Sequence, residues 1–559
     1  MSSRHVMLRP VTSAAKELGT APSFPGTRPG DVPSAGLLAT SRDRRWLLST
    51  AGPLAAIGVI ALFFRFWQLT AVGFNGDEAV YTGTAASLAG DHALGTLFPV
   101  FRAHPLLFQT LLSVLLRVHE TDWAARAFAA MIGVAAVGMT FLLGRRLYGR
   151  GAGLLGALLL AVMPYHVIVS RQVLLDGLMT LCATAALYCV VRYVEAGRLS
   201  WLLAGGSMMG AAILSKETSI ILLGGLYAFF VLTPSARMRV RHLLLTLVLL
   251  AAEIAVWPVM IRLSGHSRTG QSYLLWQMFR RPNHPAFFYF TVLPAWIGPA
   301  LLVAALAGLI WLRREATWRE RLLIAWLVVP VLFFTLWPLK GFEYLLPVCP
   351  PLAVLAGRTL ARPLPRPGWL QQQRGWDRLP WPGWLSGPQG PLRAGMGLLV
   401  AVTAVSMAIP AWGRIEPSPS RVFLAGSGGL DGGRQAGDWI QRHVPRGARL
   451  LAIGPSVANV LEFYGHHQVS ALSVSTEPHN RNPAYTPVPN PDLALRNGDF
   501  QYVVWDAYTA ARTSFFAGQA RRLASKFGGV AVYTSAVTVR APAGPDVVEP
   551  VIVIYEVHP

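Results

Sequence analysis

Residues 122–164 read DWAARAFAAMIGVAAVGMTFLLGRRLYGRGAGLLGALLLAVMP, and this stretch decides the class of the protein. It contains two apolar runs, near 122–144 and 151–164, joined by a short segment with Arg145, Arg146 and Arg150. The first run is long enough to cross a bilayer as a helix. Two such runs with an arginine-rich connection predict a membrane protein whose basic loops face the cytoplasm.

The composition of the whole chain supports this class. Of its 559 residues, 53% are hydrophobic and 14% are charged, whereas about 25% are charged in a typical soluble globular protein. The formal net charge of +22 could indicate a nucleic-acid-binding protein. The recurrence of apolar runs that are long enough to span a bilayer instead predicts a polytopic α-helical membrane protein.

The apolar runs predict about eleven transmembrane helices, and thirteen remain an alternative. The first run, near 51–70, is too long for a cleaved signal peptide and is predicted to be a signal anchor. Residues 1–46 before it are expected to form a disordered basic cytoplasmic tail. The other spans are expected near 122–144, 151–164, 174–193, 200–214, 217–233, 241–264, 286–311, 320–338, 343–361 and 394–412.

The distribution of arginines orients these spans. Arginines cluster in alternate loops, which the positive-inside rule assigns to the cytoplasm. An odd number of spans from a cytoplasmic N-terminus places the C-terminal region on the outer side of the cell membrane. The apolar segment 105–118 must then stay in the interface, inside a large first outer loop of residues 71–121. The transmembrane module is therefore expected over residues 47–412.

Residues 413–559 are predicted to form a soluble α/β domain on the outer face. Periodicity indicates helices at 435–443 and 517–527, with strands at 449–453, 502–505, 530–534 and 550–557. The glycine-rich segment 426–433 is expected to be a flexible linker. It lacks the preceding strand and the following GK[ST] of a phosphate-binding loop.

Ionisable residues at the outer ends of the spans are the candidate functional residues, because charges are costly inside a bilayer. Each has an ordinary alternative, such as a helix first turn, an interfacial ion pair or a snorkelling lysine. Their convergence on one membrane face predicts a shared site. The candidates are Asp77, Glu78, Arg171, Asp176, Lys216, Arg280, Arg281 and Lys340.

These residues fit a known pattern. Over roughly residues 50–360, the chain resembles membrane glycosyltransferases of the GT-C fold, in the bacterial branch related to protein O-mannosyltransferases and the lipid A aminoarabinose transferase. The resemblance rests on the order and spacing of several short pieces. They are Asp77-Glu78, His104-Pro105-Leu106, Trp123 to Arg146, Ala152-Gly153-Leu154, Ala161 to Pro164, Ser170-Arg171 with Asp176, Leu214-Ser215-Lys216, and Lys340 to Pro347.

The resemblance implies transfer of a sugar from a polyprenyl-phosphate carrier to an outer-face acceptor, with inversion at the anomeric carbon. Asp77 would be the catalytic base or the group that orients the acceptor, which fits the need for a carboxylate near the acceptor hydroxyl. Its neighbour Glu78 is the second residue expected in the catalytic pair, where it would support a helix or a metal. The expected ion is Mg²⁺ or Mn²⁺, held by Asp77 and Asp176. The expected substrate-binding residues are His104, Arg171, Asp176, Lys216, Arg280, Arg281, Lys340 and Tyr344, the cations among them stabilising the phosphate leaving group.

The sequence departs from the family pattern at two positions. Leu106 stands where relatives have a second proline, and Glu343 stands where many have arginine. The first change is expected to be tolerated, whereas the second could alter contacts with the lipid phosphate or the preference for a donor.

Two alternatives belong to other functional classes. A secondary transporter or flippase would also place charges among many spans, but usually with repeated halves, and no halves match here. The other alternative is a noncatalytic envelope scaffold with an outer interaction domain. Under the enzyme hypothesis, glycolipid, polysaccharide and protein acceptors all remain open.

Overall fold

The computed structural model describes residues 41–101, 103–279, 282–311, 313, 317–362, 390–417, 426–539 and 547–559. Residues from Thr50 to Pro559 form one compact unit. Most of the predicted N-terminal tail, residues 1–40, lies outside the described ranges. The end of that tail is helical, because the first helix already begins at Ser41.

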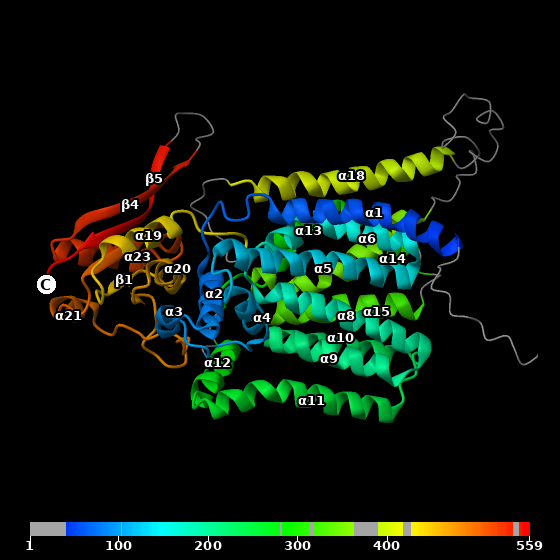
Figure 1. The fold of residues 1–559 in the computed structure, drawn as a ribbon, viewed down its shortest axis with the longest axis horizontal. Coiled ribbons are helices and arrows are strands. Elements are labelled where there is room, and N and C mark those ends of the chain that lie inside the picture. Colours follow the sequence, from blue (N-terminus) through cyan, green and yellow to red (C-terminus); the bar gives the residue numbers. More distant parts are fainter. Residues whose placement is uncertain are drawn as a thin grey trace, which may run out of the picture. The chain divides into compact units, whose positions relative to one another are not determined.

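Apolar helices that run side by side form most of this unit (Figure 1). The helices are α1 (Ser41–Phe66), α5 (Asp122–Tyr148), α6 (Arg150–Val162), α7 (Pro164–Ser170), α8 (Leu175–Ala196), α9 (Leu199–Ser215), η1 (Glu217–Ile220), α10 (Ile221–Leu232), α11 (Val240–Leu263), α13 (Phe288–Ile297), α14 (Pro299–Trp311), α15 (Trp318–Leu336), η3 (Phe342–Val348), α16 (Cys349–Ala361) and α18 (Gly390–Ile415).

The described residues include five helical segments that are long and apolar enough to cross a membrane. The number is seven if α6 with α7, and α13 with α14, each count as one bent span. Several of the other predicted spans correspond to shorter apolar helices, including α9 and the combined η1 and α10. The chain is therefore a multi-pass membrane protein, and the count of eleven spans stays a prediction.

Two sharp bends have local causes in the sequence. The axes of α6 and α7 differ by 63°, and Pro164 opens α7 at a position where its missing N–H costs nothing. The axes of α13 and α14 differ by 100°. Gly298 joins them with φ 106°, a conformation that glycine adopts without a steric penalty.

Close packing of α5, α6 and α16 depends on small residues. A methyl group on Gly357 of α16 would lie 2.6 Å from the carbonyl oxygen of Ala152. A methyl group on Gly144 of α5 would lie 2.9 Å from the Cα atom of Gly153. Membrane helices associate through such contacts, because lipid offers no hydrophobic driving force between them.

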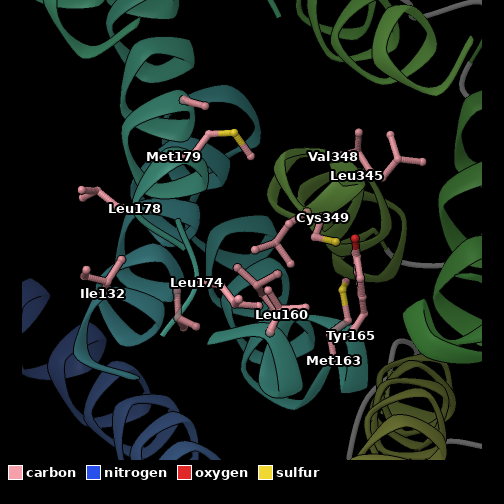
Figure 2. Packing of buried hydrophobic residues seen from close by; sticks show 14 of the residues in the cluster. Ile132, Leu160, Met163, Tyr165, Leu174, Leu178, Met179, Leu345, Val348 and Cys349 are labelled. Atoms are coloured by element: carbon pink, nitrogen blue, oxygen red, sulfur yellow. The ribbon is translucent and has the colours of Figure 1, made fainter. Parts of the chain in front are cut away.

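Larger apolar side chains fill the space around the end of α6 (Figure 2). Met163 and Tyr165 lie beside Cys349, while Leu174 and Leu178 occupy the α8 side. All are buried, and the hydroxyl of Tyr165 donates to the carbonyl oxygen of Phe342 at 2.5 Å. This contact fixes η3 against α7, and η3 carries two residues of the site described below.

One end of the bundle, here called the sheet end, carries the short helices and the C-terminal segment (Figure 1). Its short helices are α2 (Gly76–Ala89), α3 (His92–Leu97), α4 (Leu107–Leu116) and α12 (Ser267–Phe279). At 1.5 Å per residue, α4 is roughly 15 Å long, against the ~30 Å of a bilayer core. Its length fits the prediction that segment 105–118 does not cross.

The C-terminal segment forms a five-stranded mixed sheet in the order β2-β1-β3-β5-β4. Strands β1 and β2 and strands β1 and β3 pair in parallel, whereas β5 is antiparallel to both β3 and β4. The strands are β1 (Leu450–Ala452), β2 (Val469–Ala471), β3 (Tyr502–Asp506), β4 (Val530–Val539) and β5 (Val547–Glu556). The helices are α19 (Gly433–His443), α20 (Pro455–Gly465), α21 (Pro491–Arg496), α22 (Ala507–Ala510) and α23 (Ser514–Lys526).

The six elements predicted for this segment are all present, whereas α20 and β2 were not predicted. The structure joins the sheet to the bundle, because α20 packs on α2. At this junction, Arg434 forms an ion pair with Asp122 at 2.7 Å, and the Tyr464 hydroxyl donates to the same carboxylate at 2.6 Å. Whether residues 413–559 fold independently stays a prediction.

The glycine-rich segment is not the flexible linker that was expected. Leu430 pairs with Gly73 in an isolated β-bridge, and a methyl group on Gly429 would lie 2.2 Å from the Gly73 carbonyl oxygen. The Asn75 side chain donates to the Gly428 carbonyl at 2.9 Å. The glycines therefore permit a close backbone approach to the residues before α2.

Candidate functional site

The turn before α2 places two adjacent carboxylates at the sheet end. The side-chain oxygen of Asn75 accepts from the backbone N–H groups of Asp77 and Glu78, each at 3.0 Å. Glu78 completes a capping box by accepting from the Asn75 backbone at 3.1 Å. Successive helical residues point about 100° apart. The two neighbouring carboxylates therefore face different surroundings.

Glu78 forms a closed ion pair with Arg126 of α5, here called the Glu78–Arg126 pair. Nε and Nη2 of Arg126 each donate to one carboxylate oxygen at 2.7 Å. The remaining Arg126 bonds go to backbone carbonyls of Leu69, Val72 and Gly73 at 2.7 to 3.0 Å. Glu78 is fully buried. Both oxygens of Glu78 are therefore committed to protein donors, and Glu78 holds the first loop on α5. This agrees with the expectation that Glu78 supports a helix, whereas its catalytic or metal-binding role stays a prediction.

A second cluster of charge surrounds Lys216, which follows the last residue of α9. Its ammonium group donates to both carboxylate oxygens of Asp176 at 2.8 and 2.9 Å, and to Glu343 at 3.1 Å. It also lies 4.7 Å from the centre of the Tyr344 ring. Lys216 and Asp176 are buried. Three elements distant in sequence, the starts of α8 and η1 and the helix η3, are thus joined by one cation.

His104 forms the other half of this arrangement. Its Nδ1 lies 2.9 Å from a carboxylate oxygen of Glu217, the residue after Lys216. Its Nε2 lies 3.0 Å from the hydroxyl of Tyr273 on α12. The ring of Tyr81 on α2 meets the imidazole edge-on, with centroids 5.8 Å apart. We call Lys216, Asp176, Glu343, His104 and Glu217 together the Lys216 cluster.

Asp77 lies within electrostatic range of Glu343, Lys216 and His104 of the Lys216 cluster, and its side chain is exposed. The pKa of Asp77 is raised above its ordinary value. The largest cause is the loss of hydration around the carboxylate, and the second is the negative charge of Glu343. The charges of Lys216 and His104 act in the opposite direction. A carboxylate with a raised pKa is suited to accept a proton from a substrate.

The C-terminal segment also contributes a charge near Asp77. Arg512 lies between α22 and α23 and is within electrostatic range of both Asp77 and Asp506. Burial raises the pKa of Asp506, at the end of β3, to about 6. The sheet therefore does more than cover the bundle, because its loops approach the candidate base.

Two of the predicted site cations are engaged elsewhere. Arg171 donates to the carbonyl oxygens of Phe64 and Trp67, at 3.0 and 2.7 Å, at the end of α1. It lines a separate cavity of about 200 Å³ that also contains Arg126 and Arg414. The ammonium group of Lys340 donates to the carbonyls of Thr335 and Trp337 at the end of α15. Both residues neutralise helix C-termini, which is why they do not reach the Lys216 cluster.

The structure thus brings together Asp77, His104, Asp176, Lys216 and Tyr344 from the predicted set. Arg280 and Arg281 lie outside the described residues. Arg126, Glu217 and Tyr273 were not among the site residues predicted from the sequence. The arginine could have been noticed as a charge inside a predicted span, and Glu343 had been noticed only as a departure from the family pattern.

The donor set does not fit the expected divalent ion. Across the described ranges, no three His, Cys, Asp or Glu residues come close enough to hold a metal. Both oxygens of Asp176 accept from Lys216, at 2.9 and 2.8 Å, so the charge of this lysine opposes a second cation there, and Mg²⁺ or Mn²⁺ needs several oxygen ligands. We therefore derive no step that involves a metal.

Comparison with known proteins supplies the family context. Residues 103–261 match a family model described as dolichyl-phosphate-mannose-protein mannosyltransferase. The candidate mannosyltransferase YycA of Bacillus subtilis (strain 168) is 28% identical over 159 residues. That match covers 28% of this chain and 23% of the relative, so this chain corresponds to less than a quarter of the relative's length.

Solved structures resemble the chain over almost its full length. ArnT from Cupriavidus metallidurans bound to undecaprenyl phosphate superimposes with a TM-score of 0.59 at 19% identity, covering 91% of this chain and 98% of ArnT. The oligosaccharyltransferase AglB from Archaeoglobus fulgidus, in complex with an inhibitory peptide and a dolichol-phosphate, gives a TM-score of 0.56 at 15% identity, with 90% and 74% covered. The chain therefore has the GT-C fold, as the sequence resemblance implied, and residues 103–261 are similar to the protein mannosyltransferase family model.

Proposed function

We propose that this protein, which has the fold of GT-C membrane glycosyltransferases, transfers a sugar from a polyprenyl-phosphate carrier to a hydroxyl-bearing acceptor. The observation that carries the proposal is the exposed carboxylate of Asp77 beside the Lys216 cluster. The likenesses to ArnT with undecaprenyl phosphate and to AglB with dolichol-phosphate support a lipid-phosphate donor.

In the proposed reaction, Asp77 accepts the proton of the acceptor hydroxyl. The acceptor oxygen attacks the anomeric carbon from the side opposite the phosphate, and the bond between that carbon and the phosphate oxygen breaks. The polyprenyl phosphate leaves with the bonding electron pair, and the anomeric configuration inverts. No second carboxylate nucleophile is needed, which agrees with the closed state of Glu78.

Lys216 has a defined part in this proposal. It lies close enough to Asp77 to favour the ionised form of that carboxylate, and positive charge near the leaving phosphate stabilises the developing anion. Because Lys216 already binds Asp176 and Glu343, it is held in place before the substrate arrives. Such preorganisation avoids the cost of arranging a charge during the reaction.

We further propose that the sheet end faces the outer side of the cell membrane and that the N-terminus is cytoplasmic. Helix α5 begins near the junction with the sheet, where Asp122 pairs with Arg434. It ends with Arg145 and Arg146 in its last turn. The positive-inside rule assigns this arginine-bearing end to the cytoplasm.

The test uses the purified protein in lipid nanodiscs with a panel of polyprenyl-phosphate sugars, and host membrane extract as the acceptor. We expect one donor to be turned over by the wild type and its turnover to be lost in Asp77→Asn. Arg146→Ala, on a half-exposed residue at the opposite end, is the control and should keep turnover. Equal turnover of Asp77→Asn and wild type would contradict the assignment of the base, and substrate movement without bond cleavage would indicate a transporter.

A further inference from the structure

A cavity of about 690 Å³ lies between α12 and the loops of the sheet. One wall is the segment that follows β2, and another is the first half of α23. Strands β1, β2 and β3 are parallel, so these loops leave the carboxyl edge of the sheet. Open α/β sheets commonly bind ligands at this edge.

The loops at this edge converge closely. A methyl group on Gly454, after β1, would lie 2.7 Å from the Thr509 side chain and 3.4 Å from the Ser473 hydroxyl. Thr509 follows β3 and Ser473 follows β2. The carboxyl ends of three adjacent strands therefore meet beside the cavity, and Ser473 itself lines it.

The lining combines aromatic rings with uncharged hydrogen-bonding groups. Trp276, Phe515 and Phe516 supply the rings, and Phe515 is 67% exposed. Ser473, Ser475, Thr476, Asn480 and Gln519 supply hydroxyl and amide groups. Rings offer apolar faces, and hydroxyl and amide groups both donate and accept hydrogen bonds. A ligand with many hydroxyl groups and apolar C–H faces matches this lining.

The ionisable side chains that line the cavity limit the kinds of ligand that it can bind. Among the described residues that line it, Glu477 is the one ionisable side chain, and there is no lysine, arginine or histidine. The Glu477 carboxylate already accepts from the amide of Asn480 at 2.5 Å. Phosphate recognition relies on cationic donors, so this cavity does not suit the carrier phosphate. An uncharged saccharide is the better match.

The cavity connects directly to the candidate site through α12. The ring of Trp276 lies 5.6 Å from the ring of Tyr273, measured between centroids, and the Tyr273 hydroxyl lies 3.0 Å from His104. Arg512, two residues before the start of α23, is within electrostatic range of Asp77. One side chain, Tyr273, therefore links the Trp276 wall of the cavity to His104 of the Lys216 cluster.

We propose that the cavity bounded by Trp276, Phe515 and the loop after β2 binds the saccharide part of the acceptor. This inference rests on the proposed function and deepens it, because it assigns a carbohydrate class to an otherwise open acceptor. The cavity holds the neutral sugar residues near the acceptor hydroxyl, while Asp77 receives the proton.

The test measures saccharide binding separately from catalysis. The probes are mannotriose, maltotriose and chitotriose, each free in solution and each coupled to a lipid tail, with the full-length protein in nanodiscs. Binding is followed by saturation-transfer NMR for the free sugars and by co-flotation for the lipid-linked ones. The variants are Trp276→Ala, Trp276→Phe and Phe515→Ala. The control is Leu493→Ala, which truncates a 51% exposed side chain on α21.

We expect at least one trisaccharide to bind, with Phe515→Ala and Trp276→Ala weakening its binding about tenfold, which corresponds to ~1.4 kcal/mol. Trp276→Phe should retain most of the binding, and Leu493→Ala all of it. Binding of the lipid-linked probes beyond their uptake by empty nanodiscs, without binding of the free sugars, would identify a glycolipid acceptor, and binding of the free sugar would identify a polysaccharide. Either result supports the subsite.

Absence of binding by every trisaccharide, or equal binding by wild type, Trp276→Ala and Phe515→Ala, would overturn the proposal. Competition by a serine- and threonine-rich peptide, with no competition by sugars, would also overturn it. The Asp77→Asn variant separates this inference from the proposed function. It should bind the saccharide normally, so binding without any turnover in the wild type would refute the enzyme and leave the subsite.

Discussion

Two groups of charge at the sheet end differ in how completely they are satisfied. The Glu78–Arg126 pair is closed, because its carboxylate has two arginine donors and two backbone donors and is fully buried. The neighbouring Asp77 is exposed and lies within electrostatic range of the Lys216 cluster. The comparison teaches that residue type and position in the sequence do not separate a structural carboxylate from a reactive one. The two kinds differ in the number of hydrogen bonds that the carboxylate already accepts from protein groups.

The largest expected effect concerns the closed pair. Arg126→Ala leaves Glu78 buried without its partner and also removes the donors to three loop carbonyls. Breaking a buried ion pair costs about 3–5 kcal/mol, and we expect the upper end of this range in the free energy of unfolding. Chemical denaturation in detergent measures it. Arg146→Ala, which breaks an exposed pair with Glu195, should cost less than about 1 kcal/mol.

The Lys216 cluster should respond to truncation with a loss of both stability and activity. Lys216→Met leaves Asp176 buried beside Glu343 with no cation between them. We expect a destabilisation of about 3 kcal/mol and a loss of donor turnover that exceeds the loss of folded protein. Turnover per folded molecule, with the folded fraction taken from size-exclusion chromatography, separates the two effects. Unchanged turnover per folded molecule would show that Lys216 acts only in folding.

A smaller effect is expected in the pH dependence. Turnover requires ionised Asp77, and a raised pKa means that the rate falls, as the pH is lowered, at a pH above the ~3.9 of an ordinary aspartate. Glu343→Gln removes the largest charge that raises this pKa. The acidic limb of kcat/KM should therefore move to lower pH in Glu343→Gln. A limb that moves to higher pH would contradict the assignment of the charges around Asp77.

Much of the fold could be predicted because the relevant signals are local. Apolar runs predicted the long helices of the described bundle, and the strands at 449–453 and 502–505 were predicted from their buried pattern. The short strand β2 and the helix α20 were missed, since a three-residue strand carries almost no periodicity. The helix count could not be fixed, because bends at Pro164 and Gly298 divide single apolar runs into two helices.

The candidate site was less predictable, for geometric reasons. Asp77 and Glu78, like Lys216 and Glu217, are sequence neighbours whose side chains turn toward different partners. Only the packing of α5, α8 and η3 decides which partner each side chain meets. Arg171 and Lys340 were expected in the site. They instead donate hydrogen bonds to backbone carbonyls at the ends of α1 and α15. A sequence pattern of charged residues does not show which backbone carbonyls a folded chain will place beside each cation.

The central claim is that, of two adjacent carboxylates, Asp77 reacts and Glu78 holds the loop. The most direct test measures donor turnover and thermal unfolding in the same nanodisc preparations of Asp77→Asn and Glu78→Gln. We predict that Asp77→Asn unfolds at the wild-type temperature and loses turnover by about 10²-fold or more, whereas Glu78→Gln unfolds at a lower temperature and retains turnover per folded molecule. A stable, inactive Glu78→Gln together with an active Asp77→Asn would contradict the account.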